Sequence, residues 1–280
     1  MGEASMVTPA QSMAMMLRSL RLPSFQRYAE EIASKAEREG WTFGQYLKHL
    51  AELELVERKQ RRQDRYLRQS DLPRDKSLAT LTRSRLPSKV AKMLPTLCEG
   101  GFVERGDNVL AFGLPGRGKT HLLCAIGHEL IRHGHRVLFT PTYALVQRLL
   151  TAKRDLRLEK DLAALDKFDV IILDDIGYVQ QNREEMEVLF TFFAERYERK
   201  SVMITSNLVF SQWDRIFKDP MTTAAAIDRL VHHATIIEMT GKSIRAEDAA
   251  VSQKGSPTTT TKPATTTKPT TTTKGQDATT

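Results

Sequence analysis

A short glycine-rich stretch carries the residues best suited to bind phosphate. Residues 113–120 read GLPGRGKT and match the pattern G-x-x-x-x-G-K-[ST] without a mismatch. Glycines allow a tight turn that points successive N–H groups into a nest for phosphate oxygens, and the helix expected to begin at Lys119 adds its positive end. Lys119 can reach the β- and γ-phosphates, and the Thr120 hydroxyl can ligate Mg²⁺. The predicted nucleotide-binding residues are Gly113, Leu114, Pro115, Gly116, Arg117, Gly118, Lys119, Thr120 and His121.

Acidic and amide side chains follow two later apolar runs. The run VIIL ends in Asp174 and Asp175, and the run SVMIT is followed by a serine and Asn207. In parallel sheets, ligands bind beyond the carboxyl ends of the strands. We therefore expect Asp174 to hold Mg²⁺ together with Thr120, and Asp175 to orient or deprotonate the attacking water. Asn207 is expected to hydrogen-bond the γ-phosphate or this water, with an ordinary Asn turn after a strand as the alternative.

Arginine and histidine side chains supply further candidates. An arginine from a neighbouring subunit can stabilise the charge that develops in a phosphoryl-transfer transition state. Three residues could take that role, and their chemistry leaves the choice open: Arg215, Arg229 and Arg245. His232 and His233 are adjacent, so on a regular element they should point in opposite directions, which disfavours a metal site. His121 is expected to pack or hydrogen-bond within the first turn of its helix.

Strands and helices alternate from residue 106 onward, the pattern of a parallel sheet with helices on its faces. The near-continuous apolar run DVIIL is typical of a buried parallel strand. Strands are expected over 108–112, 136–140, 169–173, 201–205 and 234–238, and helices over 119–133, 142–151, 156–165 and 183–198. The predicted fold class is α/β, a P-loop domain built on a five-stranded parallel sheet without an obvious helical lid.

A small all-helical domain over 14–70 is expected to precede this sheet, with interruptions near Pro23 and Gly40 and an N-cap at Thr42. Its last part, ERKQRRQDR, has no apolar residue and would present a basic stripe on one broad helix face. This stripe consists of Arg58, Arg61, Arg62, Arg65 and Arg68. Guanidinium groups suit DNA phosphates, so we predict DNA contact here. The alternative is a solvated helix end, which acidic residues in the same helix partly support.

Three other segments differ in composition from these two domains. Residues 1–13 are expected to be disordered, as are residues 249–280, which become almost entirely Thr, Lys, Pro and Gly. Residues 71–104 contain three prolines and are expected to form a connector that wraps onto the next domain, with a short helix over 89–98. The P-loop domain would then span residues 105–248.

The overall composition narrows the class of protein. A net charge of +8 over 280 residues, with a pI near 9.5, favours a polyanionic partner such as nucleic acid. The two cysteines have no metal-ligand spacing, which indicates neither a disulfide framework nor a zinc site. No apolar run approaches membrane-spanning length, so we expect no membrane partner. A cytoplasmic, nucleoid-associated protein is therefore expected.

Several segments together closely resemble the IstB-type helper ATPases of bacterial insertion sequences. They read GLPGRGKTHLLCAIG, DVIILDDIGYV, LFTFFAERYERKSVMITSNLVFSQW, AAIDRLVHHATIIEM and GKSIR. The likeness also includes LRSLRLPSFQRYAEE and ERKQRRQDRYLR, and it covers about residues 16–247. The IstB-type proteins are AAA+ ATPases related to the DnaC and DnaI helicase loaders.

The resemblance implies a Mg²⁺-dependent ATPase, stimulated by DNA or a partner. It would form homo-oligomers on duplex DNA with ATP at the subunit interfaces. It would then remodel this target DNA and deliver it to a partner transposase of the IstA type, with hydrolysis as the switch. By position, the Walker A residues are Lys119 and Thr120, the Walker B residues Asp174 and Asp175, sensor 1 Asn207, the trans-acting arginine finger Arg229, and a nucleotide-binding arginine near the chain end Arg245. The alternatives are a DnaC-like helicase loader and a DNA-binding scaffold that binds ATP without hydrolysing it.

Overall fold

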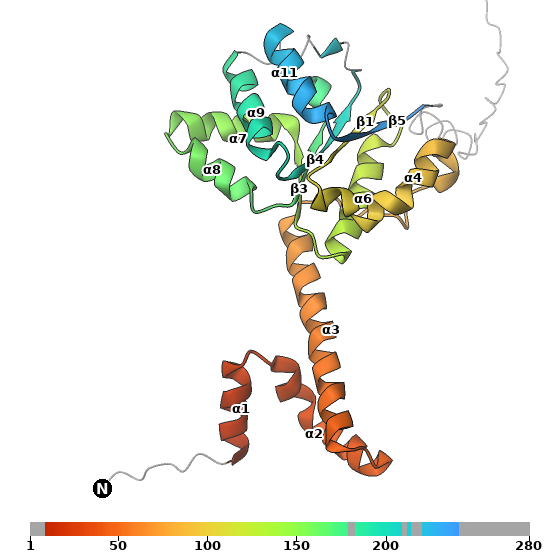
Figure 1. Cartoon of the computed structure of the whole chain (residues 1–280), viewed down its shortest axis with the longest axis vertical. Helices are drawn as coiled ribbons and strands as arrows, with labels where there is room; N and C mark the ends of the chain where they lie inside the picture. The colour runs from red at the N-terminus through yellow and green to blue at the C-terminus, as the bar shows by residue number, and fades with distance from the viewer. Residues whose placement is uncertain (1–8, 179–182, 209–211, 214–219, 241–280) are drawn as a thin grey trace, which may run out of the picture.

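The protein consists of a helical arm and an α/β domain, which the arm joins through one long helix (Figure 1). The computed structural model describes residues 9–178, 183–208, 212–213 and 220–240. The predicted disordered segment at the C-terminus, 249–280, lies outside the described residues, as do residues 1–8 of the predicted disordered N-terminus. Residues 9–13 differ from that expectation because helix α1 (Pro9–Ser19) already includes them. Proline is well suited to the first turn of a helix, where its missing N–H is not needed.

The arm is built from α1, α2 (Pro23–Glu39) and α3 (Phe43–Gln69). Gly40 ends α2 in the left-handed conformation, and Thr42 begins α3 with a capping box that pairs its side chain and backbone with Gln45. Both boundaries were predicted and are confirmed. At 27 residues, α3 is about 40 Å long, so α1 and the start of α3 stand well away from the sheet (Figure 1).

The connector after α3 contains a short 3-10 helix η1 (Arg83–Arg85), then α4 (Ser88–Glu99) and the single turn α5 (Gly101–Glu104). The short helix predicted over 89–98 corresponds to α4, whereas α5 was not predicted. Helix α4 packs along α6 (Lys119–Arg132) through buried Val90, Leu94 and Leu97. The connector therefore lies against the helix that follows the P-loop.

Five parallel strands form the sheet, in the spatial order β2-β3-β4-β1-β5. Their bounds are β1 Asn108–Phe112, β2 Val137–Pro141, β3 Val170–Asp174, β4 Ser201–Ser206 and β5 Ala234–Glu238. All four pairings are parallel, so every strand ends at the same edge of the sheet. The predicted fold class is confirmed. The order places β4 between β3 and β1, which brings the ends of these three strands together.

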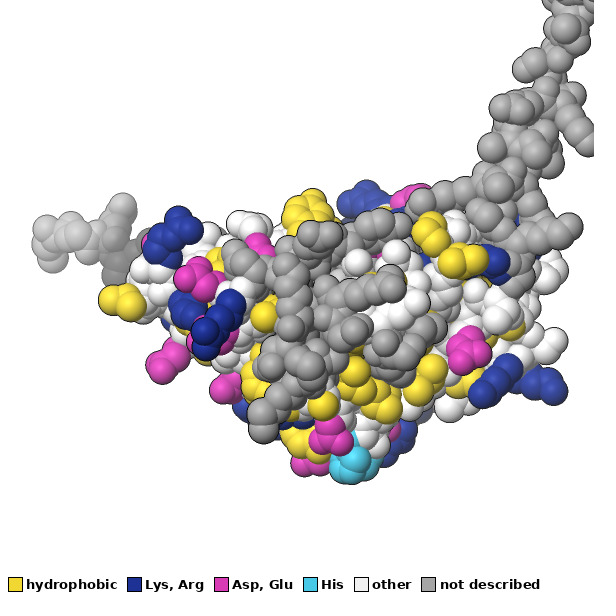
Figure 2. Space-filling model, turned by 90° about the horizontal axis from the view of Figure 1, so that it is seen from above, with side chains coloured by type: hydrophobic (Ala, Val, Ile, Leu, Met, Phe, Trp, Pro, Cys, Tyr) yellow, Lys and Arg dark blue, Asp and Glu magenta, His cyan; other side chains and the backbone are white. Residues whose placement is uncertain are grey.

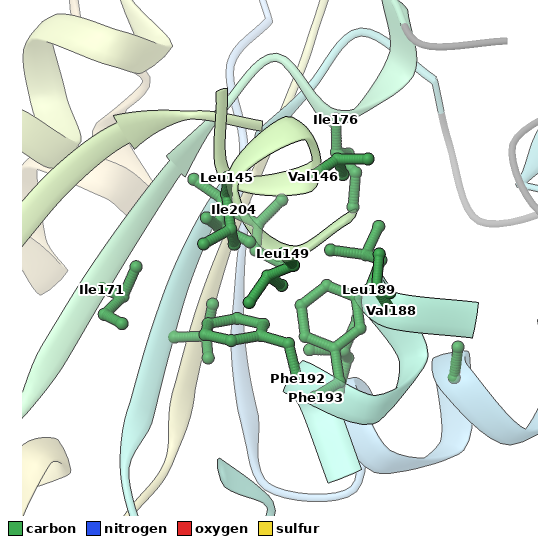
Figure 3. Packing of buried hydrophobic residues seen from close by; sticks show 14 of the residues in the cluster. Leu145, Val146, Leu149, Ile171, Ile176, Val188, Leu189, Phe192, Phe193 and Ile204 are labelled. Atoms are coloured by element: carbon green, nitrogen blue, oxygen red, sulfur yellow. The ribbon is translucent and has the colours of Figure 1, made fainter. Parts of the chain in front are cut away.

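Helices cover both faces of the sheet. Besides α6, they are α7 (Thr142–Arg154), α8 (Leu158–Leu165), α9 (Arg183–Arg196) and α11 (Pro220–Val231), with a 3-10 turn η2 (Ile176–Tyr178). Leu110 of β1 belongs to the core shared with α7, α9 and α11, while Val109 belongs to the core shared with α4 and α6. Figure 3 shows side chains of α7 and α9 meeting strand residues Ile171 and Ile204 in the first of these cores.

Helix α11 was not predicted from the sequence. Its segment, PMTTAAAIDRLV, has a proline at its first position and three consecutive alanines, which favour a helix. Ala226 and Leu230 are buried in the core against α9, so packing stabilises it. No helix among the described residues is long and apolar enough to cross a membrane.

Candidate functional site

The P-loop joins β1 to α6 and has the conformation that its glycines were expected to allow. Gly113, Gly116 and Gly118 all have positive φ, which side chains disfavour. At Gly113 a β-carbon would lie 2.5 Å from the Met239 carbonyl oxygen, so no larger residue fits. The Lys119 side chain is only 6% exposed, and its Nζ donates to the carbonyl oxygens of Gly113 at 2.6 Å and Leu114 at 3.1 Å. The Lys119 side chain is therefore held against the backbone of the P-loop by two hydrogen bonds.

Asp174, at the end of β3, lies at the centre of a hydrogen-bonded cluster. Its Oδ1 accepts from the hydroxyl of Thr120 at 2.7 Å and from the hydroxyl of Thr205 at 2.6 Å. Thr205 Oγ1 also accepts from the backbone N–H of Asp175 at 2.8 Å. The structure thus brings the predicted pair Thr120 and Asp174 together, and it adds Thr205, which sequence analysis missed. The only available signal was a hydroxyl residue at the end of the strand that proved to neighbour β3.

The Thr120 and Asp174 side chains fit a magnesium ion. Magnesium prefers oxygen ligands in an octahedron, where adjacent ligands at about 2.1 Å from the ion are about 3 Å apart. The two oxygens lie 2.7 Å apart, so a small relaxation would let both bind one ion. Thr205 donates to the same carboxylate oxygen and would help to orient it, as residues behind a metal ligand commonly do. The predicted metal ligands, Thr120 and Asp174, therefore remain a consistent pair.

Asn207 and Asp175 lie at the mouth of the P-loop. Both line a pocket of about 220 Å³, which is bounded by Lys76, Pro115, Gly116, Arg117, Gly118, Lys119, Thr120, His121, Asp175 and Asn207. Asn207 Oδ1 is buried and has no hydrogen-bond partner among the described residues. Asp175 is exposed, and its φ of 57° is unusual for a residue with a side chain. A buried amide oxygen that can still accept a hydrogen bond, and a residue with an unusual backbone conformation, are features of ligand sites.

His121 lies between the P-loop and the connector. Its Nε2 is 3.2 Å from the Ser77 carbonyl oxygen and 3.1 Å from Thr80 Oγ1. The expected hydrogen bond within its own helical turn is therefore replaced by contacts with residues more than forty positions earlier in the chain. Lys76, from the same part of the connector, also lines the pocket. Sequence analysis gave no role to this lysine.

The three candidate arginines do not gather at this pocket. Arg215 and Arg245 lie outside the described residues. Arg229, on α11, places its guanidinium carbon 4.5 Å from the centre of the Phe190 ring. Its Nη1 is buried without a hydrogen-bond partner in the described part of the chain, and Arg229 is not among the residues that line the pocket. Within one copy of the chain, Arg229 therefore does not reach the P-loop.

Arg58 and Arg61 of the basic stripe form ion pairs within the arm. Arg58 and Arg61 lie 3.1 Å and 3.0 Å from Glu54 Oε1, and Arg61 also pairs with Glu57. Burial disfavours the charge on Glu54, but hydrogen bonds from Ser24 and Arg58 lower its pKa below the usual value. The ion pairs lie within α3, and the bond from the Ser24 N–H to Glu54 joins α3 to α2. The other three residues of the stripe, Arg62, Arg65 and Arg68, are exposed and form no ion pair within the described ranges.

His232 and His233 do not point apart as expected. Their ring centres are 4.2 Å apart, and one ligand atom from each lies with one from Glu198 inside a 4.8 Å cluster. The difference arises because α11 ends at Val231, so both histidines lie in a turn rather than on a regular element. The carbonyl oxygen of His233 accepts from the N–H of Asn108 at the start of β1. The cluster thus lies at the edge of the sheet opposite the P-loop.

Figure 2 shows charged side chains of both signs interspersed with hydrophobic ones on the face seen from above. The P-loop after β1, the acidic pair after β3 and the amide after β4 lie at one edge of a parallel sheet with order 2-3-4-1-5. This arrangement defines a P-loop domain of the AAA+ class. Solved structures support the fold. The crystal structure of DnaI is similar with a TM-score of 0.51 and 24% identity, covering 61% of this chain and 96% of that chain.

AMPPCP-bound DnaA from Aquifex aeolicus is also similar in structure, with a TM-score of 0.53 and 16% identity, over 68% of this chain and 57% of that one.

The family model of the IstB-like ATP binding proteins matches residues 15–252, and the chain belongs to this family. An insertion sequence ATP-binding protein of Sinorhizobium fredii is 45% identical over 248 residues, which are 88% of this chain and 83% of that protein. The ATP-binding protein of insertion sequence IS21 from Pseudomonas aeruginosa is 36% identical, covering 83% and 88%.

Proposed function

We propose that this protein is an ATP-dependent DNA-binding helper of transposition. It would hydrolyse ATP to ADP and phosphate with Mg²⁺ as cofactor, bind duplex target DNA and deliver it to a partner transposase of the IstA type. The observation that carries the ATPase part is the cluster around Asp174, which joins the P-loop hydroxyl of Thr120 to the end of β4. Membership of the IstB-like family, whose relatives are insertion sequence proteins, supports the transposition part.

The pocket residues divide the work of phosphoryl transfer between them. The P-loop N–H groups and Lys119 would bind the phosphates, and Mg²⁺ held by Thr120 and Asp174 would neutralise charge on them. Asp175 would orient the attacking water and accept its proton, while Asn207 would hold the same water or the γ-phosphate. The water oxygen bonds to the γ-phosphorus as the bond to the bridging oxygen breaks, and the bonding electrons leave with ADP. The lining of the pocket and the hydrogen bond between Thr120 and Asp174 support these roles.

Arg229 would act on the pocket of a second copy of the chain. Its guanidinium lies against Phe190 and away from its own P-loop, and one of its nitrogens is buried without a hydrogen-bond partner among the residues described. An arginine from a neighbouring subunit would make hydrolysis depend on assembly. We therefore propose a homo-oligomer with ATP at its subunit interfaces, and Arg245 as a further nucleotide contact. The cytoplasm, in association with the nucleoid, is the proposed location.

Duplex DNA would bind along α3, and its phosphate groups would contact arginine side chains of this helix. Arg62, Arg65 and Arg68 are exposed and not paired with described carboxylates, while Arg58 and Arg61 are held by Glu54. Arg62, Arg65 and Arg68 can therefore bind phosphate without first breaking an ion pair with a described carboxylate. Contacts of this kind position DNA without reading its sequence.

Substitution of Arg65 or Arg68 by alanine should weaken binding to all duplex sequences by a similar factor. Each lost phosphate contact should lower the slope of log K against log salt concentration by about 0.9. The measurement is a salt titration of duplex binding. Lys48→Ala, on the same helix but already near Glu52, is the control and should leave the slope unchanged. An unchanged slope in both arginine variants would place the DNA elsewhere.

Duplex binding measured with ATP, with ADP and without nucleotide, together with particle mass in the same samples, tests the proposed function. We expect ATP to promote both DNA binding and large assemblies, because the hydrolytic site would be completed between subunits. Binding to single strands only would instead favour a helicase loader. Equal duplex binding in all three conditions would favour a scaffold that uses ATP only structurally.

A further inference from the structure

Residues 73–80 of the connector lie along α6, the helix that begins in the P-loop. His121 and His128 are seven residues apart and therefore lie on one face of this helix. His128 Nε2 is 3.0 Å from the Pro73 carbonyl oxygen, and His121 Nε2 is 3.2 Å from that of Ser77. The connector is thus attached to α6 at two points, on either side of residue 76.

The connector turn between these attachments is itself well ordered by hydrogen bonds. Thr80 Oγ1 donates to the Asp75 carbonyl oxygen at 2.6 Å and accepts from the Ser77 N–H at 3.0 Å. The Lys76 N–H donates to the Pro73 carbonyl oxygen at 3.2 Å. The backbone of Lys76 is therefore fixed, and only its side chain retains freedom.

Lys76 lines the phosphate-binding pocket together with Gly116, Gly118, Lys119 and Thr120. Lys76 is half-buried, and its amine makes no ion pair or side-chain hydrogen bond with any residue that the structure describes. Asp175 is the one carboxylate among the described lining residues. A partly desolvated ammonium beside a nest of N–H groups and a second lysine is suited to a polyanion.

We propose that Lys76 is a nucleotide-binding residue that the connector supplies to the P-loop site. Its amine binds phosphate oxygens of the bound nucleotide, so the nucleotide ties the connector to α6. The proposal rests on the proposed ATPase function and adds a residue and a means of regulation to the same site.

This contact links the nucleotide to the arm. The connector begins where α3 ends: the Ser70 carbonyl oxygen accepts from the Phe139 N–H of β2 at 2.7 Å, and Leu72 is buried beside Gly127 of α6. Only a few residues separate these contacts from Lys76. Nucleotide bound at the P-loop therefore stabilises the base of α3 through a single short segment of chain.

The test compares Lys76→Ala, Lys76→Gln and Lys76→Arg in the full chain. Binding of a fluorescent ATP analogue and of the matching ADP analogue is measured, with hydrogen exchange of residues 73–80 in the presence and absence of nucleotide. We expect about tenfold weaker binding of both nucleotides by the Ala and Gln variants, as for loss of one charge-assisted hydrogen bond. Lys76→Arg should restore most of the affinity, because it restores the charge. Nucleotide should slow exchange of residues 73–80 in the wild type but not in Lys76→Ala.

Two controls separate this proposal from the proposed function. Arg74→Ala removes an exposed positive charge two residues away and outside the pocket, and it should bind nucleotide as the wild type does. Wild-type affinity in Lys76→Ala and Lys76→Gln, with binding lost in Lys119→Ala, would overturn the role of Lys76 and leave the ATPase function intact. Failure of the wild type to bind either nucleotide would overturn both. Unfolding temperatures without nucleotide, equal to that of the wild type, show that the variants are folded.

Discussion

Lys119→Ala should abolish ATP-stimulated DNA binding and reduce ATP affinity by about two orders of magnitude. The Lys119 amine is almost fully buried, and in the described structure it is held at the P-loop carbonyl oxygens, within reach of the pocket. Removal of one partner from a buried charge pair costs about 2–5 kcal/mol, which is about thirtyfold to several thousandfold in affinity. The measurements are ATP binding by fluorescence and duplex binding with and without ATP.

Lys153→Ala is the matched control for Lys119→Ala. Lys153 lies on α7, has a partly exposed side chain, and pairs with the exposed Glu187. Surface pairs of this kind contribute little, so both ATP binding and DNA binding should stay at wild-type levels. If Lys119→Ala bound DNA normally in the presence of ATP, nucleotide would not be the switch for DNA binding.

Arg229→Ala should retain ATP binding but lose about a thousandfold or more of the hydrolysis rate. An arginine finger stabilises charge that appears only in the transition state, so its loss affects turnover rather than substrate affinity. The position of Arg229 against Phe190, outside its own pocket, is what favours action on a neighbouring copy. Phosphate release at saturating ATP, with ATP affinity measured separately, gives both quantities.

A mixing experiment tests whether Arg229 acts between copies. Arg229→Ala keeps an intact P-loop, and Lys119→Ala keeps its arginine, so mixed assemblies would contain some complete interfaces. Partial recovery of hydrolysis in the mixture is expected. Arg157→Ala, which removes an exposed arginine paired with Asp155, serves as the control and should turn over normally. Normal hydrolysis by Arg229→Ala would assign the finger to another residue.

Local patterns were sufficient to locate the strands and the phosphate loop. The expected strands 108–112 and 234–238 agree with β1 and β5, and the expected strand 201–205 is one residue shorter than β4. The strands expected over 136–140 and 169–173 are each displaced by one residue from β2 and β3. Apolar runs of strand length bounded by polar residues have few alternative structures in an alternating α/β chain. The glycine spacing was equally informative, because few backbone conformations let successive N–H groups converge.

Thr205 and Lys76 could not be found in the same way, because their roles depend on spatial neighbours. Thr205 reaches Asp174 only because β4 lies beside β3, with Leu173 opposite Ile204 in the register. Alternation of strands and helices predicts parallel strands but not their order. Lys76 reaches the P-loop only because the connector packs on α6, and no periodicity in a segment rich in turns indicates that path.

The basic stripe shows both the use and the limit of helical periodicity. The pattern correctly placed five arginines on α3, but it could not show that Glu54 is buried against α2 by its bond to the Ser24 N–H. Because Glu54 is buried there, Arg58 and Arg61 pair with it and are less available to DNA. The positive charge that a helix face can offer to a partner therefore depends on the neighbouring helix as well as on its own sequence.

The length of α3 makes it a lever. The helix has 27 residues, and its base is fixed to the sheet domain by Ser70 and by Gln63, whose Nε2 donates to the Arg132 carbonyl oxygen of α6 at 2.6 Å. A rotation of about 10° at that base would move the far end of a rod about 40 Å long by about 7 Å. A displacement of that size is comparable to two base-pair steps of duplex DNA, each about 3.4 Å. A small rotation where α3 joins the sheet domain would thus move the far end of α3 by a distance comparable to base-pair steps of DNA.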